Sequence, residues 1–178
     1  MSGARRTGDT VAIDGGYQHR ALTKGPAPQR FWHHAKTLAI ARLHHELLAL
    51  DTPPLIRATH IEEREFIARY GEDIGRMCYA EAKKKSFDRA GAEAFNRKLA
   101  DLWPQLREEL KPMLMDPAKM KATIAAAGGP TTATELGLDR RLWRNAMKFA
   151  RDVRNRWSFL DLADDAGLLD DFLDRDEQ

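Results

Sequence analysis

The apolar residues between positions 139 and 153 recur at intervals of three and four. This spacing predicts one helix with a single buried face. That face carries Leu142, Trp143, Ala146, Met147, Ala150 and Val153. Asp139 stands where an N-cap residue is expected. The alanine-rich helix before it is predicted to end at 128–130, because glycine accepts the left-handed cap conformation and proline cannot continue a helix.

Two pairs of residues have the spacing of a capping box. In this motif a hydroxyl and a carboxylate each bond to a backbone amide at the start of a helix. Thr132 and Glu135 are predicted to open a short turn. Thr59 and Glu62 are predicted to open a longer helix, which we expect to bend near Gly71 because glycine is a poor helix former.

Helical spacing continues along most of the chain. It predicts further helices at 31–50, 59–82, 87–111, from 116 onwards and, as the last one, at 158–167. No segment alternates with a period of two over a useful length, so we predict an all-α fold, a multi-helix bundle. The predicted divisions are an irregular N-terminal segment (1–30), a helical domain (31–173) and an acidic tail (174–178).

The bulk composition narrows the class of protein. A chain of 178 residues suits one domain, and a single cysteine excludes an internal disulfide and suggests a reducing compartment. No run of about 18 apolar residues and no apolar signal core is present, so we predict a cytoplasmic protein without a membrane partner. The net charge of +2 is too small to argue for nucleic-acid binding.

The charge is distributed unevenly. Residues 161–178 carry one arginine against eight acidic residues. Such a tail pairs with a basic face or a basic partner, or else it is solvated and frayed. We favour the solvated tail.

All six histidines lie within the first 60 residues, and imidazole both binds zinc and titrates near neutrality. His33 and His44 are separated by about 16 Å along one helix, at about 1.5 Å per residue, which one ion does not bridge. His45-Glu46 begins like a zinc-protease motif, but Ala49 stands where the second histidine is required. The pattern therefore argues against a metalloprotease.

A second chemical candidate is a group of cations near the end of the 139–153 helix. Arg151, Arg154 and Arg156 suit bidentate contacts to phosphate, and Trp157 suits stacking on a base. The alternative, which we favour, is that these arginines compensate the negative end of the helix dipole. The lysine run 83–85 is interpreted as a solvated helix face.

Three segments resemble the C-terminal end of sn-glycerol-1-phosphate dehydrogenases. They are Ala-Gly-x-Pro-Thr-Thr at 127–132, Glu-Leu-Gly at 135–137, and Ala-Arg-x-x-Arg-x-Arg-aromatic-x-Phe-Leu-Asp-Leu at 150–162. The resemblance extends upstream through 70–75 and 83–85 to 33–36. This family belongs to the iron-containing alcohol dehydrogenase and dehydroquinate synthase-like superfamily, whose C-terminal domain is a helical bundle.

The resemblance implies a metal site. The family's zinc-binding histidine at the start of the corresponding helix matches His33, although His34 replaces the glycine of the family motif. His19, in Gly-Tyr-Gln-His, is similar to a second zinc histidine that follows Gly-Ser-Glu in the family, with a shorter spacer. The third family ligand, an aspartate, and the Rossmann-like NAD(P) domain precede this region and have no counterpart here.

The implied function is the reduction of dihydroxyacetone phosphate, with zinc polarising the ketone and NADH or NADPH supplying hydride. We therefore expect the metal-binding half of such an oxidoreductase, inactive alone and completed by a separately encoded N-terminal Rossmann-like domain. The implied substrate is a small phosphorylated ketone. The alternatives are a truncated homologue or a non-catalytic helical module that binds a partner.

Overall fold

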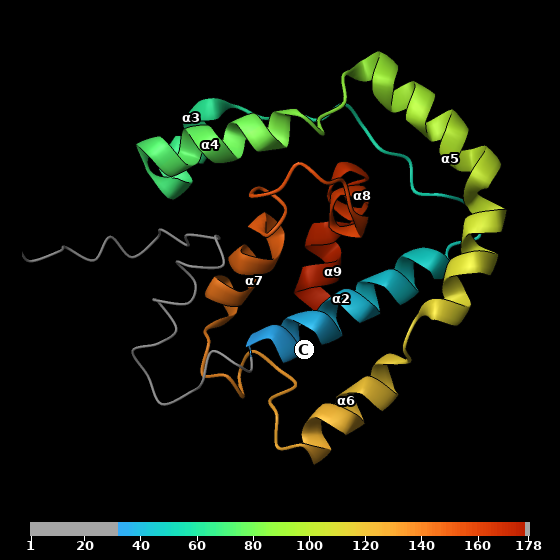
Figure 1. Cartoon of the computed structure of the whole chain (residues 1–178), viewed down its shortest axis with the longest axis vertical. Coiled ribbons are helices and arrows are strands. Elements are labelled where there is room, and N and C mark those ends of the chain that lie inside the picture. The colour runs from blue at the N-terminus through green and yellow to red at the C-terminus, as the bar shows by residue number, and fades with distance from the viewer. Residues whose placement is uncertain (1–31, 177–178) are drawn as a thin grey trace, which may run out of the picture.

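The computed structural model describes residues 32–176, with side chains from Ala35 onwards. These residues form helices and connecting loops, and the described part contains no strand (Figure 1). The elements are α2 (Trp32–Ala49), α3 (Glu63–Tyr70), α4 (Glu72–Lys83), α5 (Arg89–Leu110), a 3-10 turn η2 (Lys111–Met113), α6 (Pro117–Ala126), α7 (Arg140–Phe149), α8 (Phe159–Asp165) and α9 (Leu169–Asp176). The all-α prediction is confirmed for this range.

Helix α2 lies at the centre of the arrangement. It packs against α6 and α8, while α9 packs against α7 and α8 (Figure 1). The main core between these helices and α5 includes Leu43, Leu47, Trp103, Trp143 and Leu173, each at most 2% exposed. The periodic apolar positions of the sequence therefore form this core, since burial of such side chains is the main favourable term in folding.

Helices α3 and α4 form a hairpin with a small core of its own. Gly71 joins them with φ of 83°, a left-handed value that a side chain would strain. A Cβ at Gly75 would lie 2.6 Å from the Ile67 Cα, so only glycine permits the two helices to pack this closely. The bend predicted near Gly71 is therefore a full reversal of the chain, and Figure 1 shows the two helices side by side.

Most predicted helix starts are confirmed, and one is wrong. The carboxylates of Asp88, Asp116 and Asp139 each accept a backbone N–H in the first turn of the following helix. Helix α3 instead begins at Glu63, without a side-chain cap. The Thr59 hydroxyl accepts from the Phe87 N–H at 3.1 Å and so joins two loops rather than capping a helix.

The C-terminal end differs from the prediction. Ser158 and Asp161 form a capping box at the start of α8, and Gly167 follows its end with a positive φ. A further helix, α9, then runs to Asp176 and into the segment predicted as an acidic tail. It packs because Leu169, Phe172 and Leu173 are buried on its inner face.

Candidate functional site

A buried ion-pair network links two segments that are far apart in the sequence, one containing Lys85 and the other containing Arg151 and Asp161. The Lys85 Nζ lies 2.6 Å from the Asp161 Oδ1, and the Arg151 Nε lies 3.1 Å from the same oxygen. Lys85 also donates to the Arg151 carbonyl at 2.6 Å. The Lys85 and Asp161 side chains are 5% and 1% exposed. These cations have a structural role, so the prediction of a solvated Lys85 is wrong. The less favoured possibility that Arg151 binds phosphate is not supported by its ion pairs within the fold.

Trp157 also belongs to the interior rather than to a ligand site. Its Nε1 donates to the Asp165 Oδ2 at 3.2 Å, and its ring centroid lies 4.8 Å from that of Phe95. Arg151 contacts the other carboxylate oxygen of Asp165 at 3.2 Å. Burial raises the pKa of Asp165, and the charge of Arg151 opposes this shift. The predicted base-stacking role of Trp157 is therefore not supported by its position.

The acids of α9 make ion pairs with basic residues of α2 and α7. Asp170 contacts Lys148 at 2.7 Å and Arg144 at 2.8 Å. Asp174 contacts Arg144 at 2.9 Å, and Asp176 contacts the Arg42 Nε at 2.5 Å. The expectation of a solvated, frayed tail is wrong for these residues, and the alternative of a tail paired with a basic face describes them.

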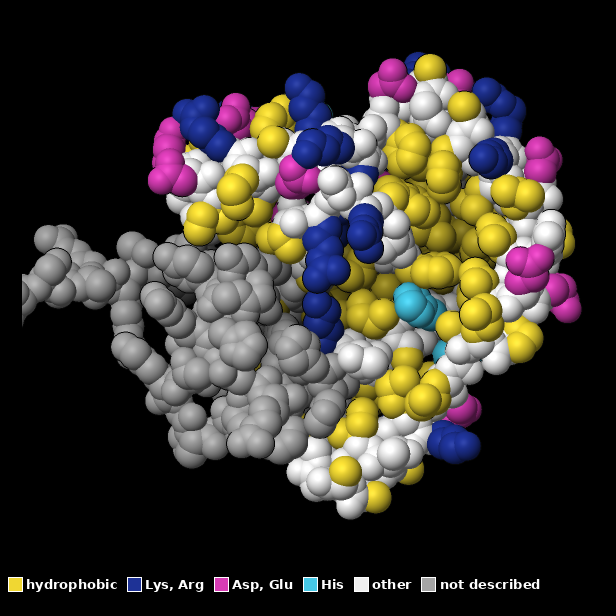
Figure 2. Space-filling model, in the orientation of Figure 1, with side chains coloured by type: hydrophobic (Ala, Val, Ile, Leu, Met, Phe, Trp, Pro, Cys, Tyr) yellow, Lys and Arg dark blue, Asp and Glu magenta, His cyan; other side chains and the backbone are white. Residues whose placement is uncertain are grey.

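Arg154 and Arg156 follow α7 in an exposed turn. Neither makes an ion pair with another residue of the 32–176 range. Lys36, on α2, lies close enough to Arg154 to be affected by its charge: burial lowers the pKa of Lys36, and the positive charge of Arg154 lowers it further. Figure 2 shows a strip of Lys and Arg side chains on the face in view. We call Lys36 and Arg154 the basic site.

The predicted metal ligands lie at the edge of the described structure or beyond it. His33 stands in the first turn of α2, three residues before Lys36, but its side chain and all of His19 lie outside the described part. The described histidines have other contacts: His44 packs on Phe159 with centroids 4.6 Å apart, and the His45 Nε2 lies 3.1 Å from the Met115 carbonyl. Within the described residues no group of three potential ligands could hold a metal ion. The zinc site remains a prediction.

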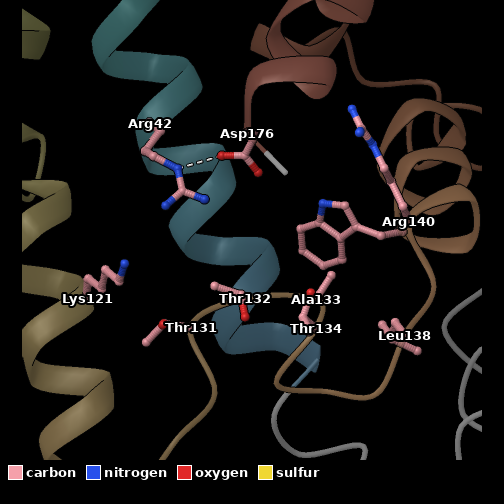
Figure 3. Close-up of a pocket in the computed structure, with 10 residues that line it drawn as sticks. Arg42, Lys121, Thr131, Thr132, Ala133, Thr134, Leu138, Arg140 and Asp176 are labelled. Carbon is pink, nitrogen blue, oxygen red and sulfur yellow. Dashed lines mark hydrogen bonds and ion pairs between the residues drawn. The ribbon is translucent and has the colours of Figure 1, made fainter. Parts of the chain in front are cut away.

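A pocket of about 320 Å³ lies between α2, α6, the 131–138 loop and the start of α7 (Figure 3). We call it the threonine pocket. Its lining residues are Arg42, Lys121, Thr131, Thr132, Ala133, Thr134, Leu138, Arg140, Trp143 and Asp176. Three of these side chains are cationic and one is acidic. The pocket therefore carries a net positive charge.

The loop of the threonine pocket is held by Glu135. The Thr132 hydroxyl accepts from the Glu135 N–H at 3.2 Å, as predicted for a capping box. The Glu135 carboxylate instead accepts from the Thr131 N–H at 2.5 Å, one residue earlier than predicted. This hydrogen bond is the main reason that the pKa of Glu135 is lowered. The arrangement fixes the threonines at the pocket wall.

Arg42, Lys121 and Arg140 were not among the site residues predicted from the sequence. They come from three helices, and nothing in their local spacing links them. Figure 3 shows Arg42 and Lys121 on one side of the pocket and Arg140 on the other. Only the packing of α6 against α2 brings the first two together.

Comparison with family models, with curated proteins and with solved structures finds no match to this chain. Among the described helices, none combines the length and apolar character that crossing a bilayer requires.

Proposed function

We propose that this chain is the helical, metal-binding half of a glycerol-1-phosphate dehydrogenase-like, NAD(P)-dependent oxidoreductase that acts on a small phosphorylated ketone. The observation that supports the proposal is electrostatic: burial and then the charge of Arg154 lower the pKa of Lys36. Lys36 belongs to the 33–36 segment and Arg154 to the 150–162 segment, which were matched to the family separately.

The chemistry of the basic site suits the phosphate end of such a substrate. Lys36 and Arg154 are like charges, and burial makes their proximity more costly. A bound phosphate removes this repulsion and accepts hydrogen bonds from both groups, with Arg154 able to bind it bidentately. His33 precedes Lys36 by three positions in α2.

The buried ion-pair network gives a second line of support. Lys85, Arg151 and Asp161 come from two separately matched segments, 83–85 and 150–162, and meet within 3.1 Å. If the short motifs matched the family only by chance, residues from separate motifs would have no reason to contact one another. Their contact favours a shared fold behind the resemblance.

The proposal includes zinc and a second polypeptide. His33 and His19 are the proposed zinc ligands, and two histidines alone would hold the ion weakly, so a further ligand comes from the partner. When bound, zinc polarises the ketone oxygen. A separately encoded Rossmann-like domain supplies the nicotinamide cofactor. The part of this chain is to bind the phosphate group and to contribute metal ligands.

The alternative is a non-catalytic interaction module or a truncated homologue. The observation in its favour is exposed apolar surface: Leu55, Met77 and Met113 are between 65% and 78% exposed. Figure 2 also shows a hollow lined by apolar side chains between α5 and α2. Such patches are typical of surfaces that bind another protein. A cofactor domain would also use them, so a binding assay alone does not separate the two functions.

The test is the reduction of dihydroxyacetone phosphate, followed as oxidation of NADH and of NADPH in the presence of zinc. We expect no activity from the chain alone and activity when it is mixed with a separately produced N-terminal cofactor domain of the family. His33→Ala should abolish this activity and lower zinc stoichiometry, whereas the exposed His60→Ala should change neither. If the chain binds the cofactor domain without zinc and the mixture does not reduce dihydroxyacetone phosphate, the chain is a non-catalytic interaction module.

A matched pair of variants tests the phosphate contact directly. Calorimetric titration with inorganic phosphate should show weaker binding for Arg154→Gln than for the wild-type chain. Arg97→Gln, an exposed arginine on α5, should leave the affinity unchanged. An equal loss of phosphate affinity in both variants would indicate general electrostatic attraction to the surface and would contradict the proposal.

A further inference from the structure

We propose that the hollow between α5 and α2 is a docking site for one helix of a different polypeptide, with an apolar face and acidic residues beside that face. Figure 2 shows apolar side chains and a histidine around this hollow, which we call the α5 groove. Its walls include Phe95, Leu102 and Leu106 of α5 and, on the other side, His44 of α2 and Phe159 of α8. The inference uses no zinc, no nicotinamide and no phosphate, so it does not rest on the proposed oxidoreductase.

Helix α5 is held along one edge by the end of α2 and the chain that follows it (48–56). The Asn96 side chain donates to the Ile56 carbonyl at 2.9 Å and accepts from the Ile56 N–H at 3.0 Å. The Trp103 Nε1 and the Arg107 Nε each donate to a backbone carbonyl of the same segment at 3.0 Å. In contrast, α5 is not among the described helices that pack closely against α2 or α8. A gap lined by side chains is therefore left between them.

The neighbouring face of α5 is apolar and is directed towards this gap. Phe95, Leu102 and Leu106 share the face, because they are separated by about two turns and then about one turn of helix. Phe95 fixes its direction: its ring centroid lies 4.8 Å from that of Trp157, just before α8. Leu102, further along the same face, is 39% exposed. An apolar stripe of this kind is normally covered by another element.

The dimensions of the α5 groove favour a helix as its occupant. Helix α5 has 22 residues and is therefore about 33 Å long. Grooves between helices accept an amphipathic helix through apolar residues spaced by three or four positions. His44 and Phe159, with ring centroids 4.6 Å apart, add partly buried ring surface to the opposite wall. The groove thus offers apolar contacts from two sides.

The charges beside the groove indicate the kind of helix that it accepts. Lys98 lies three positions after Phe95 and is its neighbour on the helix surface, while Arg156 directly precedes Trp157. Both cations are exposed, and neither makes an ion pair with another residue of the 32–176 range. Asp101 lies six positions after Phe95 and so belongs to another face of α5. Acidic residues on the flank of a docked helix would complement Lys98 and Arg156.

The helices of this chain do not have the required combination of properties. Helix α6 has no buried residue and is open to a second copy, but Lys119 and Lys121 would bring like charges to Lys98 and Arg156. Helix α9 is acidic, but its apolar residues are buried in the core of the chain itself. The partner is therefore a different polypeptide rather than a second copy.

The test uses the full chain and three labelled helical peptides of about 18 residues, a length above that at which isolated helices are marginal. The first has a leucine stripe flanked by glutamates, the second has the same stripe flanked by lysines, and the third has the composition of the first with scrambled leucines. Fluorescence anisotropy measures their binding. We expect the first peptide to bind, the second to bind at least about tenfold more weakly, and the third not to bind.

Two matched pairs of variants locate the binding surface. Leu102→Asp should weaken the glutamate peptide by at least about tenfold, whereas Met77→Asp, which changes a residue 65% exposed on α4, should leave its affinity unchanged. Lys98→Glu should weaken the glutamate peptide and strengthen the lysine peptide, each by about threefold. Arg97→Glu, on another face of α5, should do neither. Circular dichroism checks that each variant keeps its helical content.

Four results would overturn the proposal. The first is equal weakening by Leu102→Asp and Met77→Asp, and the second is absence of glutamate-peptide binding to the folded chain. The third is a dimer in sedimentation experiments that Leu102→Asp dissociates, since a second copy would then fill the groove. The fourth is binding that appears only after residues 1–31 are removed, since that segment would then be the occupant.

Discussion

The cations between positions 144 and 151 and those at positions 154 and 156 have different surroundings, although their sequence is one continuous basic pattern. Arg144, Lys148 and Arg151 contact acids of α8 and α9 at 2.7–3.2 Å. Arg154, three residues after Arg151, has a lysine of α2 in its vicinity instead. The same residue type thus stabilises the fold at one position and is available to a ligand at the other. Only the neighbouring elements distinguish the two roles.

The positions of the acidic residues in α8 and α9 explain why Arg151 is paired and Arg154 is not. Asp161 is placed by the capping box at the start of α8, and Asp165 ends that helix, so both face Arg151. Asp170 and Asp174 lie one turn apart on α9 and reach Arg144. Beyond Arg151, neither Arg154 nor Arg156 makes an ion pair with an acid of the described residues. These two cations are therefore the ones from which function is expected.

The largest predicted effect comes from Arg151→Gln. Removing this charge leaves Asp161 and Asp165 buried with one partner fewer, and breaking a buried pair in this way costs about 3–5 kcal/mol. Arg154→Gln should change the free energy of unfolding by less than about 0.5 kcal/mol, since no ion pair is lost. Urea denaturation measures both. Equal losses in the free energy of unfolding would contradict the different roles assigned to Arg151 and Arg154.

A second, smaller effect is predicted for Asp152, which lies in the same turn but pairs with the α3–α4 hairpin. The Tyr70 hydroxyl donates to the Asp152 Oδ2 at 2.7 Å, and the Arg69 Nη1 lies 2.6 Å from the same oxygen. Burial raises the pKa of both Tyr70 and Asp152. Tyr70→Phe should therefore lower stability by about 1–3 kcal/mol. Tyr79→Phe, for which no hydroxyl hydrogen bond is found within 32–176, is the control and should have a smaller effect.

The exposed pairs of α9 should contribute least to stability. Asp170→Asn should cost at most about 1 kcal/mol at neutral pH, and the loss should shrink in 1 M salt. Burial opposes ionisation of Asp170, but the hydrogen bonds and charges of Lys148 and Arg144 together outweigh it and lower the pKa below 3.8. A lowered carboxyl pKa stabilises the fold above 3.8, and this contribution is lost as the pH falls through the folded value. The stability difference between wild type and Asp170→Asn should therefore close in acid, whereas Asp171→Asn should show no difference at either pH.

The smallest predicted effect is a pH shift in phosphate affinity at the basic site. Phosphate binds the protonated form of Lys36, so affinity falls as the pH rises through the pKa of this lysine, which lies below 10.5. Calorimetric titrations with inorganic phosphate from pH 8 upwards measure this fall. Arg154→Gln removes one cause of the lowered pKa and should move the fall to higher pH. An unchanged midpoint would contradict the proximity of the two residues.

The features predicted correctly from the sequence are local ones. Asp139 caps α7, as predicted, because a carboxylate three residues before a backbone N–H suffices to form the contact. The helices predicted to begin near 87 and 116 do so, and Asp88 and Asp116 cap them in the same way. Gly128 ends α6 for a similarly local reason, its positive φ of 72°. The all-α fold follows from these signals together with the period of the apolar residues.

The features missed from the sequence depend on contacts between distant segments. Lys85 looks like part of an exposed lysine run, and its partner Asp161 lies 76 positions away. Arg42 and Asp176 are 134 positions apart, so neither the threonine pocket nor the paired acidic helix could be predicted from spacing. Thr59 shows the opposite error: it has capping-box spacing, but its hydroxyl bonds to the distant Phe87. Residue spacing predicts a hydrogen bond of a side chain only when no partner from a distant segment competes for that side chain.

The separate core of the α3–α4 hairpin has a consequence for motion. Phe66, Tyr70 and Cys78 pack with one another and with the end of α7, apart from the cluster around α2. The hairpin can therefore open as a cooperative unit while the larger cluster stays closed, as is common for supersecondary units in native-state exchange. Cys78 is the single thiol of the chain and is buried inside this unit. The rate at which it reacts with an alkylating reagent thus reports how often the hairpin opens, and Tyr70→Phe should raise that rate by loosening the attachment.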